Sequence, residues 1–238
     1  MDSPHPHPHP SSPSPSSSSL VPRRGRPAGA VAVRTGLVCG FLAGVLLVLV
    51  AVRWPPLLSL DHSVAGALHG RAVTEPGVVR VNRVLTDWVW DPWAMRALIA
   101  VAVIVLWWRG ARLLAVWVAA TSTLTTLVQQ GLKAAVGRER PRWTDPVDSA
   151  HYASFPSGHV LTAVVTCGLL VWLLHMYRAR PALLRAVEAV AVISVIGVGF
   201  TRLYLGVHWL SDVLGGLLLG VTAVAFSAAG YAVLSRRS

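Results

Sequence analysis

Three clusters of polar residues interrupt a sequence that is otherwise strongly apolar. Each cluster stands directly beside an apolar run and combines cations, hydroxyl groups or histidines. The clusters are Lys133 to Pro141, Pro156 to His159, and Thr201 to Asp212. These residue types are what phosphate chemistry requires, because an anion must be bound and a nucleophile must be supplied.

The cations and the small residues predict a phosphate-binding site. Lys133, Arg140 and Arg202 supply positive charge, and arginine matches phosphate oxygens with paired hydrogen bonds. Ser157 and Gly158 precede an apolar run that we expect to be helical, so backbone N–H groups and the helix dipole can face an anion. Gly158 would also let the backbone approach the phosphate closely, because it has no side chain.

The two histidines and the aspartate predict how a phosphate ester would be broken. His208 and Asp212 are four residues apart at the start of a predicted helix, so their side chains share one face. Asp212 can hold one ring nitrogen of His208, which leaves the other nitrogen free to attack. His159 would protonate the leaving oxygen and then activate water. The reaction would pass through a phosphohistidine and would need neither a metal nor a cofactor, because the cations stabilise the transferring group.

Six apolar segments position these clusters. They span residues 35–52, 94–108, 113–132, 160–177, 183–200 and 210–234. A helix needs about 20 apolar residues to cross a bilayer, and the short second segment reaches this length if it extends back through Trp88–Trp93. The sequence therefore predicts an all-α integral membrane bundle of six transmembrane helices. Six crossings place both termini on one membrane face and all three polar clusters on the other.

Composition and charge agree with a membrane protein and disfavour other classes. Only 13% of the residues are charged, about half of the usual share in a soluble domain. The formal net charge of +11 comes mostly from arginines between apolar runs, which is typical of membrane-flanking charge rather than of nucleic-acid binding. Cys39 and Cys167 lie inside apolar runs, so neither a disulfide framework nor a Cys-rich metal site is expected.

The chain divides into two predicted parts. Residues 1–34 form a His-, Pro- and Ser-rich tail that ends in arginines and is too polar to fold, and residues 35–238 form the six-helix domain. Basic residues beside the helix ends predominate on the terminal face, so the positive-inside rule predicts cytoplasmic termini and an extracytoplasmic site. The near absence of lysine, together with abundant Ala and Val, indicates a GC-rich bacterial genome, so the expected location is a bacterial plasma membrane.

Several other residues are assigned structural roles. Arg138 and Arg142 are interpreted as interfacial charges, with contact to a substrate head group as the alternative. Glu188 lies near the inner end of its helix with Arg185 nearby, and it is interpreted as structural, either in an ion pair or snorkelling to the interface. Gln129 and Gln130 are expected to make hydrogen bonds between helices, and Gly215, Gly216 and Gly220 are expected to be close-packing positions.

The three clusters together resemble the signature of the type-2 phosphatidic acid phosphatase superfamily. The matching motifs are Lys133-x6-Arg140-Pro141, Pro156-Ser157-Gly158-His159 and Arg202-x5-His208-x3-Asp212. Thr201 stands where the family usually has serine, and because it keeps the hydroxyl it is a possible further phosphate contact. The resemblance implies a site near the outer membrane surface, with His208 as nucleophile, Asp212 as its orienting partner and His159 as acid and base.

The leading hypothesis is metal-independent dephosphorylation of a lipid phosphate or pyrophosphate. The candidate substrates are phosphatidic acid, phosphatidylglycerol phosphate and polyprenyl pyrophosphate, whose chains can stay in the bilayer while the phosphate is cleaved. The alternatives are a lipid phosphotransferase, a vanadium haloperoxidase, and a non-catalytic transporter or scaffold of the same fold. The haloperoxidases are typically larger soluble proteins, and a non-catalytic relative would be expected to lose a histidine. The predicted partners are the lipid substrate and the bilayer, and the oligomeric state is left open.

Overall fold

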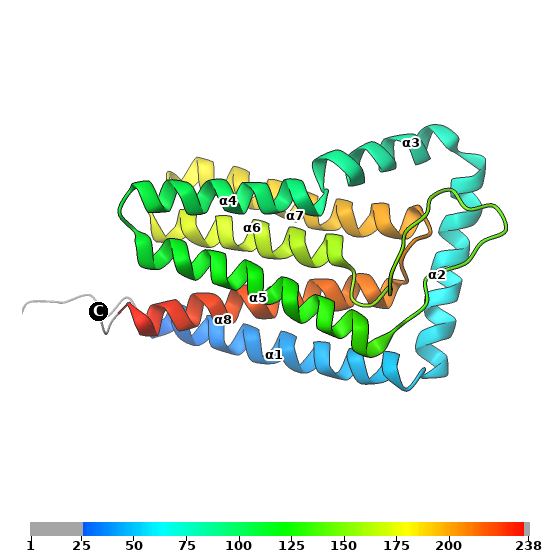
Figure 1. Ribbon diagram of the computed structural model, residues 1–238, viewed down its shortest axis with the longest axis horizontal. Helices are drawn as coiled ribbons and strands as arrows, with labels where there is room; N and C mark the ends of the chain where they lie inside the picture. Colours follow the sequence, from blue (N-terminus) through cyan, green and yellow to red (C-terminus); the bar gives the residue numbers. More distant parts are fainter. Residues whose placement is uncertain (1–25, 236–238) are drawn as a thin grey trace, which may run out of the picture.

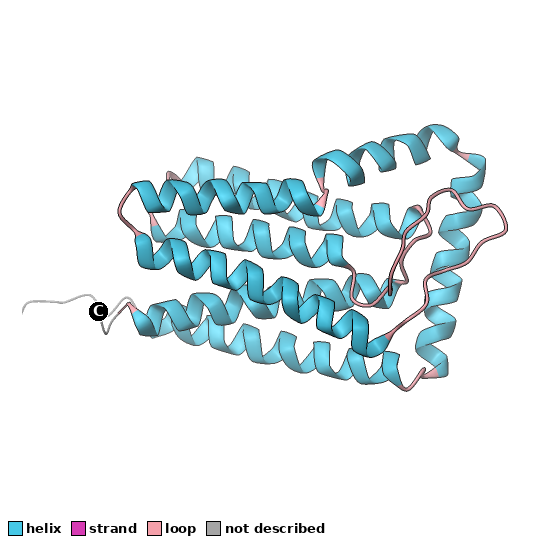
Figure 2. Cartoon of the chain, viewed as in Figure 1, coloured by secondary structure: helices cyan, strands magenta, loops and turns pink. Residues whose placement is uncertain are grey.

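The structure, a computed structural model, describes residues 26–235, and helices form all the regular structure of this part of the chain. Figure 2 shows these helices joined by loops. The elements are α1 (Arg26–Ala51), α2 (Pro55–Thr74), α3 (Pro76–Val84), the π-helical turn η1 (Leu85–Val89), α4 (Pro92–Trp108), α5 (Arg112–Val136), α6 (Gly158–Met176), α7 (Pro181–Tyr204) and α8 (Leu210–Leu234). The all-α class predicted from the sequence is confirmed.

Six segments of the described residues are long and apolar enough to cross a membrane. They are α1 from Gly29 onward, the run Pro76–Trp108 that contains α3, η1 and α4, and the helices α5, α6, α7 and α8. The predicted bundle of six transmembrane segments is therefore confirmed, although α2, which lies in the predicted first loop, adds a further long helix.

The second segment is interrupted where the sequence suggested a continuous extension through Trp88. Asp91 stands between η1 and α4. Its carboxylate accepts hydrogen bonds from Trp93 N at 2.7 Å and from Ala94 N at 3.0 Å. Pro92 follows as the first helical residue, a position at which the missing N–H of proline is harmless. α4 therefore begins at Pro92, and η1 precedes it as a separate turn.

The long helices run side by side, and α2 lies across one end of them (Figure 1). α8 packs against both α1 and α6, and α6 also contacts α4 and α7. α6 is the most buried of the six segments, so the core of the bundle lies around it. The start of α1 and the end of α8 both lie at the end of the bundle opposite α2 (Figure 1).

Three glycines bring α8 close to α6 and to the segment before it. A Cβ atom at Gly215, Gly216 or Gly220 would lie 2.6–2.7 Å from the nearest heavy atom, which real Cβ atoms do not tolerate. At Gly216 that atom is the backbone oxygen of Ser157. The close approach lets Ser157 N donate a hydrogen bond of 3.0 Å to Asp212 O. The predicted close-packing role of the three glycines is confirmed, and it joins two of the polar clusters.

The start of α1 differs from the predicted boundary of the N-terminal tail. α1 begins at Arg26, so the boundary predicted between residues 34 and 35 falls inside this helix. The remainder of the tail prediction concerns residues 1–25, which lie outside the described residues.

Candidate active site

The three polar clusters meet at the end of the bundle that α2 covers. α5 and α7 end there, α6 and α8 begin there, and the long loop between α5 and α6 folds over the same end (Figure 1). Lys133 and Arg202 lie in the last turns of α5 and α7, whereas Gly158 and Asp212 lie in the first turns of α6 and α8. The fold therefore brings together residues that are far apart in the sequence, the most distant of which, Lys133 and Asp212, are separated by 79 positions.

His208 is held by the carboxylate of Asp212. The Nδ1 atom of His208 lies 3.2 Å from Oδ2 of Asp212, and only 1% of the His208 residue is exposed. The same carboxylate oxygen accepts a hydrogen bond of 2.9 Å from Trp209 N, which fixes Asp212 at the start of α8. Gly206 supplies the turn before His208, because its φ of 66° lies in the left-handed region that glycine adopts easily.

Arg140 lies against the other nitrogen of His208. Its Nη1 atom is 3.1 Å from Nε2 of His208 and also donates to Val207 O at 2.7 Å. Further N–H groups of Arg140 donate to the backbone oxygens of Tyr152 and His151 at 2.9 and 3.2 Å. Arg140 thus ties the loop before α6 to the loop before α8, with its charge beside the imidazole.

These two neighbours determine which nitrogen of His208 carries the proton. An arginine can only donate hydrogen bonds, so Nε2 must accept, and an ionised carboxylate can only accept, so Nδ1 must carry the hydrogen. Burial, followed by the charges of Arg140, Arg202 and Lys133, holds the pKa of His208 well below its ordinary value. The imidazole is therefore neutral near pH 7, with an unprotonated Nε2.

The remaining predicted phosphate contacts surround the same place. Ser157 is fully buried, and its Oγ atom has no hydrogen-bond partner among the described residues. Arg202 is buried as well, with Nη1 donating to Oγ1 of Thr86 at 3.2 Å and Nε without a partner in residues 26–235. Thr86 lies in η1, so this π-helical turn orients Arg202, a role that the sequence did not reveal. Lys133 Nζ donates to Ala153 O.

His159 and Gly158 occupy the first turn of α6. The His159 side chain is half-buried there, at the same end of the bundle as His208. A Cβ atom at Gly158 would lie 2.6 Å from Nε2 of Gln129, so the end of the Gln129 side chain would have to move to admit one. The eight residues predicted to bind phosphate or to catalyse its transfer are thus gathered at one end of the bundle.

Thr201 is placed differently from these eight residues. It is buried, and its hydroxyl donates a hydrogen bond of 2.9 Å to Val198 O in its own helix. The hydroxyl is therefore engaged within α7, in contrast to the unpartnered hydroxyl of Ser157.

Arg138 corrects one interpretation made from the sequence. Rather than lying at the interface, its side chain is only 10% exposed and bridges two buried carboxylates. Nη2 lies 2.6 Å from Oδ2 of Asp61, and Nη1 lies 2.7 Å from Oδ1 of Asp212. Asp61, in α2, was missed because a single aspartate in a long loop carries no motif. Arg142 is 81% exposed and pairs with Glu139, as expected of a surface charge.

Two other structural assignments have mixed outcomes. Glu188 does have a partner, but it is His175, whose Nε2 lies 2.9 Å from Oε1 of the glutamate, and not the nearby Arg185. Gln129 is buried against Gly158, yet its Oε1 has no hydrogen-bond partner among the described residues, so the predicted interhelical hydrogen bond is absent there.

No group of three or more His, Cys, Asp or Glu side chains within the described part of the chain is arranged to hold a metal ion.

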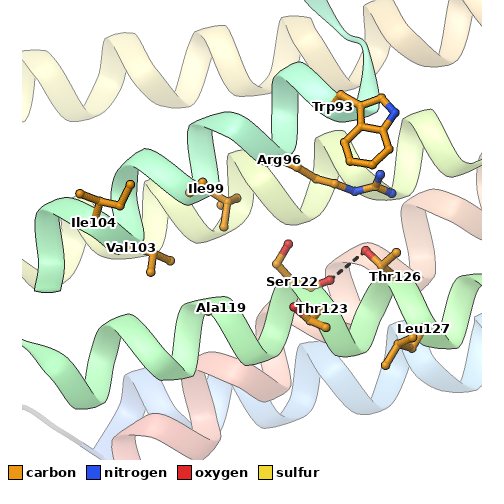
Figure 3. A pocket seen from close by; sticks show the side chains of 11 residues that line it. Trp93, Arg96, Ile99, Val103, Ile104, Ala119, Ser122, Thr123, Thr126 and Leu127 are labelled. Carbon is orange, nitrogen blue, oxygen red and sulfur yellow. Dashed lines mark hydrogen bonds between the residues drawn. The ribbon is translucent and has the colours of Figure 1, made fainter.

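A groove of about 540 Å³ lies between α4 and α5 on the outside of the bundle. Figure 3 shows the Arg96 side chain extending beside the ring of Trp93, with Thr126 on the facing helix. The guanidinium lies 5.2 Å from the centre of the Trp93 ring. Beyond them, the lining is apolar on the α4 side and mixed on the α5 side: Ile99, Ala100, Val103, Ile104, Ala119, Ser122, Thr123 and Leu127.

The α5 wall of the groove leads toward the site. Thr126, Gln129 and Lys133 are spaced by three and four residues, so they follow one another along the same face of α5. Gln129 packs against Gly158, and Lys133 reaches the loop before α6. A molecule in the groove would therefore lie one to two helical turns from the predicted phosphate contacts.

The chain is similar in sequence to a known bacterial protein. The chain is 35% identical over 98 residues to phosphatidylglycerophosphatase B of Bacillus subtilis (strain 168). The aligned region covers 40% of this chain and 47% of that protein. The match thus spans about half the length of this relative.

Two solved structures match the chain over most of its length. A crystal structure described as the first transmembrane PAP2 type phosphatidylglycerolphosphate phosphatase from Bacillus subtilis has a TM-score of 0.71 at 23% identity, over 83% of this chain and 95% of that one. A crystal structure of Aquifex aeolicus LpxE has a TM-score of 0.47 at 20% identity, over 73% of this chain and 95% of that one. The model of the PAP2 superfamily matches residues 114–235, which is more than half of the chain and includes all three polar clusters. The chain belongs to the PAP2 superfamily.

Proposed function

We propose that this protein removes phosphate from a membrane lipid by attack of His208 on phosphorus. The observation that carries the proposal is the placement of His208 between Asp212 and Arg140, which leaves Nε2 unprotonated and close to positive charge. A neutral imidazole with a fixed tautomer is a ready nucleophile. Arg140 would move its N–H from Nε2 to a phosphate oxygen when substrate binds.

The first half of the reaction forms a phosphohistidine. Nε2 of His208 forms a bond to phosphorus while the bond from phosphorus to the lipid oxygen breaks, and His159 gives its proton to that oxygen. The imidazole of His208 becomes cationic, and the carboxylate of Asp212 stabilises this charge. Lys133 and Arg202 bind the equatorial oxygens of the transferring group and stabilise the charge that develops there.

The second half of the reaction returns the enzyme to its starting state. His159, now neutral, takes a proton from a water molecule whose oxygen attacks phosphorus. The bond between phosphorus and Nε2 breaks, and inorganic phosphate leaves. In both halves the buried Oγ of Ser157 and the N–H groups at the start of α6 would donate hydrogen bonds to phosphate, which is supported by the lack of another partner for Oγ among the described residues.

The groove between α4 and α5 supports a lipid as the substrate. Its apolar lining faces the membrane side of the bundle and suits a hydrocarbon chain, while Arg96 and the α5 hydroxyls suit the polar region of a lipid. Phosphatidylglycerol phosphate is the first lipid to test, because the name of the 35% identical relative specifies this substrate.

The test is release of inorganic phosphate by the detergent-purified protein in excess chelator. The panel contains phosphatidylglycerol phosphate, phosphatidic acid and polyprenyl pyrophosphate, and the variant His208→Ala is assayed beside the wild type. We expect release from at least one lipid, its loss in the variant, and an acid-labile phosphate on His208 after rapid quenching. Release that persists in folded His208→Ala would refute the mechanism, and transfer of phosphate to a second lipid instead of water would identify a phosphotransferase.

A further inference from the structure

α2 carries one carboxylate that reaches from the cover of the bundle into its interior. Asp61 is 1% exposed, and Ala65, His69 and Ala72 continue its buried face along the helix. The rest of α2 is largely exposed. Asp61 lies outside residues 114–235, which the PAP2 model matches, and outside the three signature motifs. A buried carboxylate is costly unless it is fully paired, so its contacts require an explanation.

Both oxygens of Asp61 are used at the start of α8. Oδ1 accepts a hydrogen bond of 2.9 Å from Ser211 N. Oδ2 accepts one of 2.6 Å from Ser211 Oγ and lies 2.6 Å from Nη2 of Arg138. Ser211 precedes Asp212, so Asp61 holds the backbone directly beside the carboxylate that orients the nucleophile.

Arg138 links Asp61 to that carboxylate. Its Nη1 donates to Oδ1 of Asp212 at 2.7 Å and to Ser211 Oγ at 2.6 Å. The other oxygen of Asp212 faces Nδ1 of His208. A continuous chain of charge-assisted hydrogen bonds therefore runs from Asp61 through Arg138 and Asp212 to His208.

The charges of these hydrogen-bonded residues affect the stability of the imidazolium that the proposed reaction forms. Two carboxylates share one guanidinium, so the Asp61–Arg138–Asp212 group carries a formal charge of about −1 when ionised. That excess negative charge stabilises the imidazolium that forms when Nε2 of His208 bonds to phosphorus. Without the charge of Asp61, Arg138 would neutralise Asp212 alone, and the imidazolium would lose this support.

We propose that Asp61 is a positioning residue for phosphoryl transfer: it fixes Arg138 and the first turn of α8, and thereby sets the orientation and the charge of the Asp212 carboxylate that holds His208. The inference rests on the proposed function of His208. Asp61 acts through Arg138 and Asp212 and touches no reacting atom.

The variants Asp61→Asn and Asp61→Glu test this inference. The asparagine keeps the shape and one acceptor but removes the charge, and the glutamate restores the charge on a longer side chain. We expect Asp61→Asn to lower kcat and the single-turnover rate of His208 phosphorylation by about 10-fold or more while KM stays within about two-fold. Asp61→Glu should recover part of the loss. A wild-type kcat in Asp61→Asn would overturn the inference.

Glu75→Gln is the matched control for a purely structural role of α2. Glu75 stands at the end of the same helix, and its Oε2 accepts a hydrogen bond of 2.9 Å from the hydroxyl of Tyr204 in α7. It therefore also ties α2 to the bundle but has no contact with Arg138. We expect Glu75→Gln to lower the unfolding temperature without changing kcat. An equal loss of kcat in both variants would show that α2 matters only as a cover.

Asp61 can affect the site through Arg138 or through its hydrogen bonds to Ser211. A double-mutant cycle with Arg138→Gln separates these two routes. If Asp61 acts through Arg138, Asp61→Asn should lower kcat much less in the Arg138→Gln background than in the wild type. Fully additive losses would overturn the proposed route. Failure of the proposed function has a different signature, because His208→Ala would then retain phosphate release, whereas failure of this inference leaves a His208-dependent enzyme that is insensitive to Asp61→Asn.

Discussion

His208 stands between a group that only accepts hydrogen bonds and a group that only donates them. Asp212 requires a hydrogen on Nδ1, and Arg140 requires a lone pair on Nε2. The tautomer that the proposed attack requires is therefore already set by these two neighbours. Preorganisation of this kind removes a rearrangement from the reaction path.

Asp212→Asn should disturb this tautomer with little change in shape. The amide of asparagine can donate to Nδ1, which would move the hydrogen of His208 to Nε2 and remove the attacking lone pair. We expect kcat to fall by about 10³-fold with a much smaller change in KM. Steady-state assays on the preferred lipid measure this effect. Asp91→Asn, at the remote N-cap of α4, is the control and should keep its activity.

The low pKa of His208 also predicts how stability depends on pH. In the unfolded chain His208 has a pKa of about 6.5, whereas in the native protein its pKa is well below this value. As the pH falls below about 6.5, the unfolded chain binds a proton that native His208 does not, so the native state loses stability.

Thermal unfolding of the wild type and of His208→Asn between pH 7 and pH 5 checks this expectation. The unfolding temperature should fall further between pH 7 and pH 5 in the wild type than in the variant. Parallel curves for the two proteins would mean that native His208 titrates near its ordinary pKa.

At the scale of elements, the contact between α6 and α8 depends on a residue without a side chain. Gly216→Ala would place a Cβ atom 2.7 Å from the backbone oxygen of Ser157 and would push the start of α6 away. We expect a loss of about 1–3 kcal/mol in the free energy of unfolding, together with reduced activity. Gly44→Ala in α1, where nothing lies within 4 Å, is the control. It should be at least as stable as the wild type, as measured by unfolding in detergent.

The groove between α4 and α5 yields a second prediction at this scale. Ala119→Phe would fill the groove, and because this position is distant from His208 it should leave the chemistry intact. We expect slower hydrolysis of a long-chain lipid phosphate but an unchanged rate on a short-chain, water-soluble analogue. Ala120→Phe adds the same bulk at an exposed neighbour that does not line the groove. Equal effects of the two variants on the long-chain substrate would contradict a role for the groove.

The elements also show what sequence could and could not predict. The six apolar segments follow from hydropathy because a bilayer demands long apolar helices. The length and position of α2 do not follow from hydropathy, because only one narrow face of this helix is buried. Arg138 was misinterpreted because its partners Asp61 and Asp212 lie 77 and 74 residues away along the chain. Local charge patterns carry no information on such distant pairings, whereas the motifs ending at His208 and Asp212 have fixed local spacing.

At the scale of the whole molecule, the site lies at one end of the bundle, and the start of α1 and the end of α8 lie at the other (Figure 1). The predicted orientation therefore puts the site outside the cytoplasm when the termini are inside. In a chain with Cys39 and Cys167 replaced by alanine, an impermeant thiol reagent added to intact bacterial cells should label Ser149→Cys, in the loop after α5, but not Ser235→Cys. The opposite labelling pattern would reverse the orientation.

The outward-facing groove between α4 and α5 has a consequence if, as proposed, a lipid substrate reaches the site through it. A lipid that enters sideways never passes through water, so collisions take place in two dimensions. The quantity that saturates the enzyme is then the mole fraction of substrate in the bilayer and not its bulk molarity. Diluting the substrate with inert lipid should slow turnover even when the total substrate in the tube is constant, and adding buffer should have no effect. The lipid composition of the surrounding leaflet would then regulate the rate of the proposed reaction.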